Sequence, residues 1–187
     1  MKKGVVVPNG FELVEKEIPG EKERKNLVIR FLEEGKFIQA EEIPGVKNEK
    51  IDEIRQLLAE WSVTNFKAKN RKDTISIEEI LETIKLVITK KDNLLFIKKR
   101  LGVVNGFEIC KEKTDKGLYN IEIRYLKLGL YIGSNSFNRI KSATIDNILV
   151  KLLDWCLYNL DVENQARSIS WLDMTYLIQS EVDKEKN

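Results

Sequence analysis

The stretch NLVIRFLEEGKFI, residues 26–38, returns with the same pattern as NIEIRYLKLGLYI, residues 120–132. The match continues towards the C-terminus without a gap. At a constant offset of 94 residues, the identical pairs include Ile29/Ile123, Arg30/Arg124, Gly35/Gly129, Trp61/Trp155 and Ser76/Ser170. The sequence therefore predicts a tandem duplication, and a repeat of this length constrains the architecture before any other pattern is considered.

Each repeat is expected to place its strands before its helices. The tetrapeptide NGFE occurs at residues 9–12 and again at 105–108, and Asn-Gly between apolar runs is a strong signal for a two-residue hairpin turn. Alternating apolar and polar residues predict a half-buried strand next, and Gly35 or Gly129 turns the chain into another. With a short strand before the first hairpin, the expected strands span residues 5–7, 11–14, 27–32, 37–40, 107–113, 119–126 and 130–133.

Two helices are expected after the strands of each repeat. Apolar residues at three- and four-residue spacing between Ile51 and Trp61 are typical of a helix with one buried face. The second helix is expected over residues 76–90 in one repeat and 170–182 in the other. Candidate capping residues for the first helices are Asn48, Ser142 and Thr144. The predicted fold class is α+β, with approximately ββββαα in each repeat and a pseudo-two-fold relation between the repeats.

The expected organisation is a first repeat over residues 1–91, a connector over 92–104 and a second repeat over 105–187. A length of 187 residues permits either two small domains or one fused domain. In the order of its elements alone, the chain resembles the whirly and PUR-type single-strand-binding proteins. That resemblance implies a nucleic-acid partner, although fold analogy by itself does not establish function.

The composition is that of an ordinary globular protein, with 42% hydrophobic and 33% charged residues and a net charge of +2. No apolar run is long enough to span a membrane, and the N-terminus lacks the apolar stretch of a signal peptide. We therefore expect a cytoplasmic protein without a membrane partner.

Catalytic chemistry is not predicted. The chain has no histidine, which removes the commonest general base and metal ligand, and it has no phosphate-binding loop or nucleophile elbow. Its two cysteines, Cys110 and Cys156, align with Val14 and Ser62 of the first repeat, so both are expected to be buried, reduced thiols. We expect no enzyme activity, no cofactor and no metal site.

Positive charge is concentrated between the repeats. Residues 66–104 carry ten basic and five acidic side chains. The basic residues singled out as candidate partner contacts are Lys90, Lys91, Lys98, Lys99 and Arg100. Such a run is commonly a solvated surface, but it is also the kind of charge that binds a polyanion.

Arg30 and Arg124 occupy matching positions in the middle of a predicted strand, on the face opposite its apolar residues. One interpretation is structural, with each arginine paired to a glutamate of the adjoining strand, such as Glu12 or Glu108. The other is functional. If Ile38 and Ile132 point inward, Phe37 and Tyr131 point outward, and an aromatic ring beside an arginine suits nucleic-acid bases or a protein interface.

These observations predict a non-enzymatic binding protein that engages nucleic acid through its sheet faces and its basic connector. The alternative is a protein-binding adaptor or inhibitor, for example a phage counter-defence protein or a chaperone-like module. The oligomeric state is left open between a monomer with internal pseudo-symmetry and a homodimer.

Overall fold

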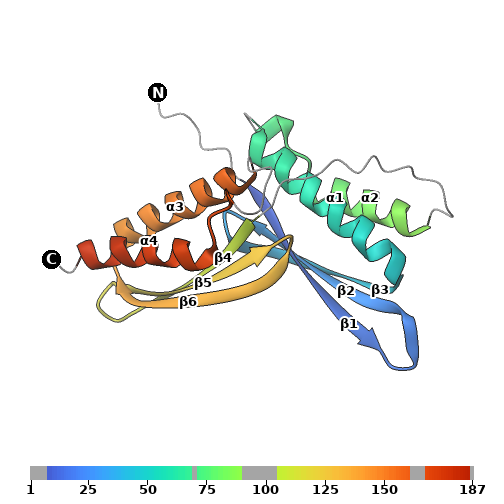
Figure 1. Ribbon diagram of the computed structural model, residues 1–187, viewed down its shortest axis with the longest axis horizontal. Helices are drawn as coiled ribbons and strands as arrows, with labels where there is room; N and C mark the ends of the chain where they lie inside the picture. The colour runs from blue at the N-terminus through green and yellow to red at the C-terminus, as the bar shows by residue number, and fades with distance from the viewer. Residues whose placement is uncertain (1–7, 69–70, 90–104, 161–166, 186–187) are drawn as a thin grey trace. The chain divides into compact units, whose positions relative to one another are not determined.

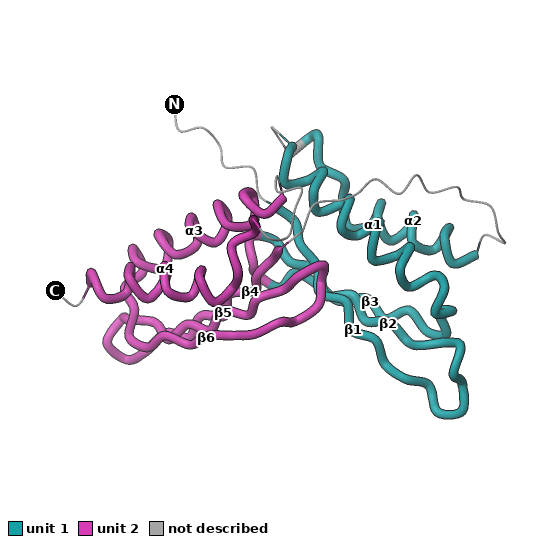
Figure 2. Tube along the Cα trace, viewed as in Figure 1, with its two compact units in different colours: residues 1–33, 37–101 teal, residues 34–36, 102–187 magenta. Residues whose placement is uncertain are grey.

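The computed structural model describes residues 8–68, 71–89, 105–160 and 167–185. The chain divides into two compact units (Figure 2). Unit 1 comprises residues 1–33 and 37–101, and unit 2 comprises residues 34–36 and 102–187. In each unit three strands precede two longer helices (Figure 1). The connector predicted over residues 92–104 lies outside the described residues.

Unit 1 is built on an antiparallel sheet with the strand order β1-β2-β3. Its elements are β1 (Asn9–Ile18), β2 (Glu21–Glu33), β3 (Lys36–Lys47), α1 (Asn48–Lys67), the short 3-10 helix η1 (Arg71–Asp73) and α2 (Ile77–Thr89). Both longer helices lie on one face of the sheet (Figure 1). Leu27, Ile29 and Phe31 are fully buried beneath them, because alternate residues of a strand point to the same face.

Unit 2 repeats this order with the sheet β4-β5-β6. Its elements are β4 (Asn105–Lys113), β5 (Tyr119–Lys127), β6 (Leu130–Ile140), α3 (Ser142–Leu160) and α4 (Trp171–Lys184). Ile121, Ile123 and Tyr125 of β5 form the buried row beneath α3 and α4. The predicted α+β class, with strands before helices, is therefore confirmed, whereas the duplication itself stays a prediction.

Each sheet has three strands, so the prediction of four strands per unit was wrong. Asn9-Gly10 lies inside β1 and Asn105-Gly106 lies inside β4, each paired with the end of the next strand. Asn-Gly tolerates a tight turn but does not require one, and here pairing with a distant strand decides the conformation. The turn between β1 and β2 instead uses Gly20, which has a φ of 85°. Residues 5–7, the expected first strand, lie outside the described residues.

The turns predicted at Gly35 and Gly129 are present, and each is built from two residues with positive φ. Glu34 and Gly35 have φ values of 47° and 72°, and Leu128 and Gly129 have values of 49° and 75°. This combination is that of a type I′ turn, whose twist matches the twist of the strands it joins. The third strand in each sheet is much longer than the predicted four residues.

An asparagine side chain braces the third strand at the same place in both units. Gly45 N donates to Asn26 Oδ1 at 2.9 Å, and Arg139 N donates to Asn120 Oδ1 at 3.2 Å. The donor residue has a positive φ in each case, 65° at Gly45 and 60° at Arg139. The asparagine therefore supplies a partner for a backbone N–H at a point where the strand conformation is interrupted.

The two tryptophans on the first helix of each unit anchor the core. Trp61 and Trp155 are buried, as predicted, and each indole N–H is satisfied. Trp61 Nε1 donates to the carbonyl of Ile75 at 2.8 Å, and Trp155 Nε1 donates to that of Ile169 at 2.9 Å. These bonds tie the first helix to the segment that leads into the second. The edge-on ring partners from the sheet are Phe31, at a centroid distance of 5.5 Å, and Tyr125, at 5.7 Å.

The helix starts differ in part from prediction. Asn48 does not cap α1. The N-cap is Lys47, and Asn48 Nδ2 donates to the carbonyl of Lys22 at 3.0 Å, because a hairpin carbonyl is within reach of its side chain. Caps are present on the second helices, where Ser76 Oγ accepts from Glu79 N at 3.2 Å and Ser170 Oγ accepts from Asp173 N at 3.1 Å. The expected helices therefore begin one residue later, at positions 77 and 171.

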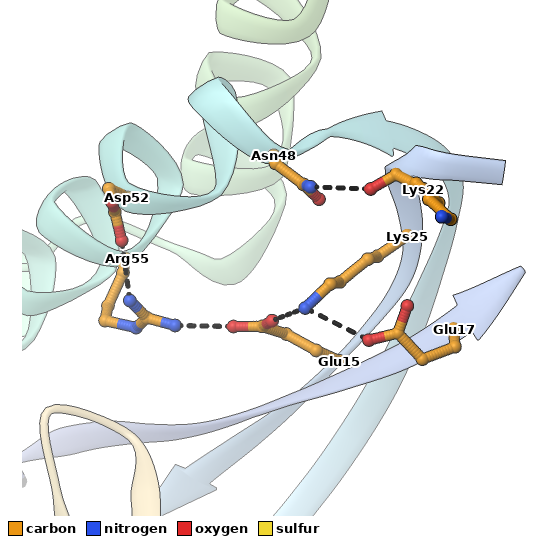
Figure 3. A network of polar contacts seen from close by, with 7 residues as sticks. All are labelled: Glu15, Glu17, Lys22, Lys25, Asn48, Asp52 and Arg55. Atoms are coloured by element: carbon orange, nitrogen blue, oxygen red, sulfur yellow. Dashed lines mark hydrogen bonds and ion pairs between the residues drawn. The ribbon is translucent and has the colours of Figure 1, made fainter.

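A charged network joins the β1–β2 hairpin of unit 1 to α1 (Figure 3). Glu15 is at its centre, with one carboxylate oxygen 2.7 Å from Arg55 and the other 2.9 Å from Lys25. Arg55 also pairs with Asp52 at 2.8 Å, and Lys25 with Glu17 at 3.2 Å. The hydrogen bond between Lys25 and Glu15 stabilises the charged form of both groups. It lowers the pKa of Glu15 and raises the pKa of Lys25. This network attaches the hairpin to α1 in a region where most residues of β1 and β2 are exposed.

The cysteines are not equivalent. Cys156 is buried, as expected, and burial raises the pKa of its thiol well above the usual range. Cys110 is exposed, so the expectation of burial was wrong there. It lies on β4 and its match in unit 1, Val14, is exposed as well, because both residues are on the strand face opposite the helices.

Candidate binding surfaces

The two candidate arginines lie at matching positions on the middle strands, each directly opposite a glutamate. Arg30 is in register with Glu12, and Arg124 is in register with Glu108. The Nη1–Oε2 distances are 2.5 Å in unit 1 and 2.6 Å in unit 2. The glutamates are only 4% and 3% exposed, so each arginine faces a buried carboxylate that offsets its charge.

Each arginine also contacts the candidate aromatic residue of the third strand. The guanidinium carbon of Arg30 is 5.2 Å from the ring centroid of Phe37, and that of Arg124 is 5.2 Å from the ring of Tyr131. These are cation–π distances. Phe37 is 50% exposed and Tyr131 is 52% exposed, so both side chains are open to solvent. The structure thus assembles a Glu–Arg–aromatic cluster in each unit, on the sheet face opposite the helices.

The isoleucine after each candidate ring is exposed, which corrects the expectation that Ile38 and Ile132 point inward. In unit 2 the reason is a register shift. Tyr125 pairs with Gly133 and Leu126 pairs with Tyr131, so Ile132 has no partner in β5 and bulges from the ladder. A strict alternation from the sequence does not anticipate a bulge.

An exposed apolar run lies at the start of each third strand. The exposed residues are Phe37 and Ile38 in unit 1 and Leu130, Tyr131 and Ile132 in unit 2. We call these two groups the strand-start patches. Each adjoins the arginine of its own cluster.

The basic candidates cannot be placed relative to either cluster. Lys90, Lys91, Lys98, Lys99 and Arg100 all lie outside the described residues. The structure therefore unites four of the nine candidates, as two pairs, and places none of the other five.

A further surface, on the helices of unit 2, was not predicted. Large apolar side chains are exposed there at Val150, Leu157, Tyr158, Leu172, Tyr176 and Leu177. The aligned residues of unit 1 are Gln56, Val63, Thr64, Glu78, Glu82 and Thr83, of which only one is apolar. Comparing the two repeats at the solvent-facing positions of their helices would have revealed this difference, because apolar residues there serve no core.

Unit 2 also contains a hollow of about 290 Å³ between α3 and α4. Trp155 and Met174 line it, with Tyr158 and Leu177 beside them and Lys151 and Asp154 as its charged residues. An apolar lining with so few polar groups can accept an apolar side chain but offers little to orient a polar ligand.

Metal-binding and membrane-spanning features are not found in the described part of the chain. No group of three or more cysteine, aspartate or glutamate side chains is placed to hold a metal ion there. None of the helices described combines the length and apolar character needed to cross a lipid bilayer.

Comparison of the chain with models of protein families, with curated proteins and with solved structures gives no match. The binding surfaces are therefore interpreted from their own chemistry.

Proposed function

We propose that the protein is a non-enzymatic binding protein and that its partner is another protein, recognised through the strand-start patches. One observation carries the proposal: in both units, half-exposed apolar and aromatic side chains lie beside an arginine whose charge is offset by a buried glutamate. An aromatic and arginine surface with little net charge is typical of a protein interface.

Charge favours a protein partner over nucleic acid. Phosphate binding is favoured by a guanidinium whose positive charge is not neutralised by a nearby carboxylate. Arg30 and Arg124 each have a carboxylate within hydrogen-bonding distance. The strand that carries Phe37 contains two lysines and two glutamates, so it adds no net positive charge for a polyanion.

Single-stranded nucleic acid is the second candidate partner, and the exposed rings favour it. A base can stack on the free face of Phe37 or Tyr131 while the arginine holds the other face. Here stacking dominates over phosphate contacts, so the affinity falls only weakly with salt. This contrasts with the slope of about −0.7 per neutralised phosphate expected of a single strand bound by free cations.

The two clusters support a further part of the proposal, that the units descend from a duplicated ancestor and act as two copies of one binding element. The glutamate, the arginine and an aromatic ring occupy matching positions in both units. A partner with two similar epitopes then gains affinity by binding both units at once.

The test is affinity capture from an extract of the native cell, with and without nuclease, and titration of a labelled single-stranded oligonucleotide at low salt. We expect a protein that is retained after nuclease treatment and lost with the combined change Phe37→Ala and Tyr131→Ala. Leu86→Ala, which removes an exposed apolar side chain from α2, is the matched control and should retain it. Oligonucleotide binding that Phe37→Ala and Tyr131→Ala abolish, with no protein retained, would establish the second candidate instead.

A further inference from the structure

Edge strands are normally protected against pairing with another chain by charged residues or proline. The strands β1, β3 and β4 follow this rule, since each contains at least four charged residues. In β6, by contrast, residues 130–138 read LYIGSNSFN and carry no charge. Within the described part of the chain, β6 pairs only with β5, at the edge of the sheet away from β4 (Figure 1).

Helix α4 lies above this unprotected edge. Asn135 Nδ2 donates to Thr175 Oγ1 at 2.8 Å, and a Cβ added to Gly133 would lie 2.9 Å from the ring of Trp171. Leu177, in contrast, lines the hollow shared with α3. At 100° per residue, Leu172 and Tyr176 therefore fall on the side of α4 that faces away from α3, next to the residues that contact β6.

Leu172 and Tyr176 are conspicuous on that side because they are 53% and 75% exposed. The aligned residues of unit 1 are Glu78 and Glu82. The same comparison holds for the strand, where Ser136 aligns with Glu42. Both the strand edge and the helix above it thus lack, in unit 2, the charges that unit 1 carries at matching positions.

We propose that β6 and α4 form a self-association surface. The β6 strand pairs antiparallel with β6 of a second copy, so that two three-stranded sheets become continuous. The two α4 helices then meet across the same two-fold axis and cover each other's Leu172 and Tyr176. The interface uses the backbone edge of β6, whereas the strand-start patch of unit 2 uses the side chains of Leu130, Tyr131 and Ile132 at the beginning of the same strand.

Two features of the surface identify the occupant as a second copy. An extended peptide paired with β6 satisfies the strand edge but leaves the apolar side of α4 uncovered. A second copy brings its own α4 and covers both, which helps to reach the roughly 800 Å² per partner of a stable interface. Self-pairing of β6 across residues 130–138 also brings no like charges together, because this segment has no charged residue.

The experiment measures the mass of the full-length protein by analytical ultracentrifugation over roughly 1 to 100 µM, a range that brackets a micromolar dissociation constant. We expect a concentration-dependent dimer. Ser136→Glu at the strand edge, and Leu172→Glu with Tyr176→Glu on the helix, introduce the residues of unit 1 and should each raise the dissociation constant at least about tenfold. Val150→Glu makes the same kind of change at an exposed position on α3 and should leave the dimer intact.

Amide hydrogen exchange gives an independent measurement at the strand. Residues 133–137 should exchange more slowly as the concentration of the wild-type protein rises, and Ser136→Glu should remove that dependence. Circular dichroism confirms that each variant is folded. A wild-type monomer throughout the range overturns the proposal. So does a dimer that resists either the strand or the helix variant, or one that Val150→Glu dissociates equally well.

Discussion

Truncation of the core tryptophan of unit 2 should be among the most destabilising single changes in the protein. Trp155 is 2% exposed, packs edge-on against Tyr125 and donates its indole N–H to the carbonyl of Ile169. A buried aromatic side chain of this size removes about 200 Å² from water, worth about 5 kcal/mol at 25 cal/mol per Å². Partial collapse of the site lowers this figure, so Trp155→Ala should reduce the free energy of unfolding by about 3–5 kcal/mol.

Trp155→Phe separates the hydrogen bond from the ring. Phenylalanine keeps most of the apolar contact but leaves the Ile169 carbonyl without this donor, so the expected loss is about 1–3 kcal/mol. Urea denaturation followed by circular dichroism measures both variants, and Trp61→Ala and Trp61→Phe provide the matched pair in unit 1. A loss below 1 kcal/mol for Trp155→Ala, or equal losses for the alanine and phenylalanine variants, would refute this reasoning.

Other predictions concern strained backbone and acid sensitivity. Arg139 has a φ of 60° where unit 1 has Gly45, so Arg139→Gly should raise the free energy of unfolding by about 0.5–1 kcal/mol in urea denaturation, because relief of strain exceeds the entropy lost by glycine. Leu128, with a φ of 49° in its type I′ turn, should yield a higher Tm when changed to Asn, measured by thermal unfolding. The pKa of Glu15 is lowered from 4.5 by Lys25, so its contribution is complete above pH 4.5 and is lost as the pH falls through the lower folded-state value. In the Glu15→Gln variant, the free energy of unfolding should therefore decrease less between pH 7 and pH 3 than in the wild-type protein, as measured by denaturation at each pH.

Local sequence patterns determined the fold class and several anchor points. Strands before helices, the turns at Gly35 and Gly129, and the burial of Trp61 and Trp155 all follow from periodicity and from glycine's tolerance of positive φ. These features depend on residues close together in the chain, so a pattern within one segment is sufficient to predict them.

Only the tertiary structure decided how strands register with one another. Asn9-Gly10 continues β1 because β2 offers it a pairing partner, and Ile132 is exposed because the β5–β6 ladder shifts by one residue. Neither outcome is encoded in the local sequence alone, since a one-residue shift in register moves a side chain to the other face.

The candidate site shows the same division. The sequence placed Arg30 and Arg124 on a strand face and left two interpretations open. The cross-strand register then put Glu12 and Glu108 directly opposite them, which offsets the charge that phosphate binding would need. The absence of charge in residues 130–138 is visible in the sequence. That this segment is an edge strand beneath α4 follows only from the strand order and from the packing of α4 on β6. The sequence specifies the charge and hydropathy of each residue. Contacts between distant segments decide which charged residues pair and which strand lies at the edge of a sheet.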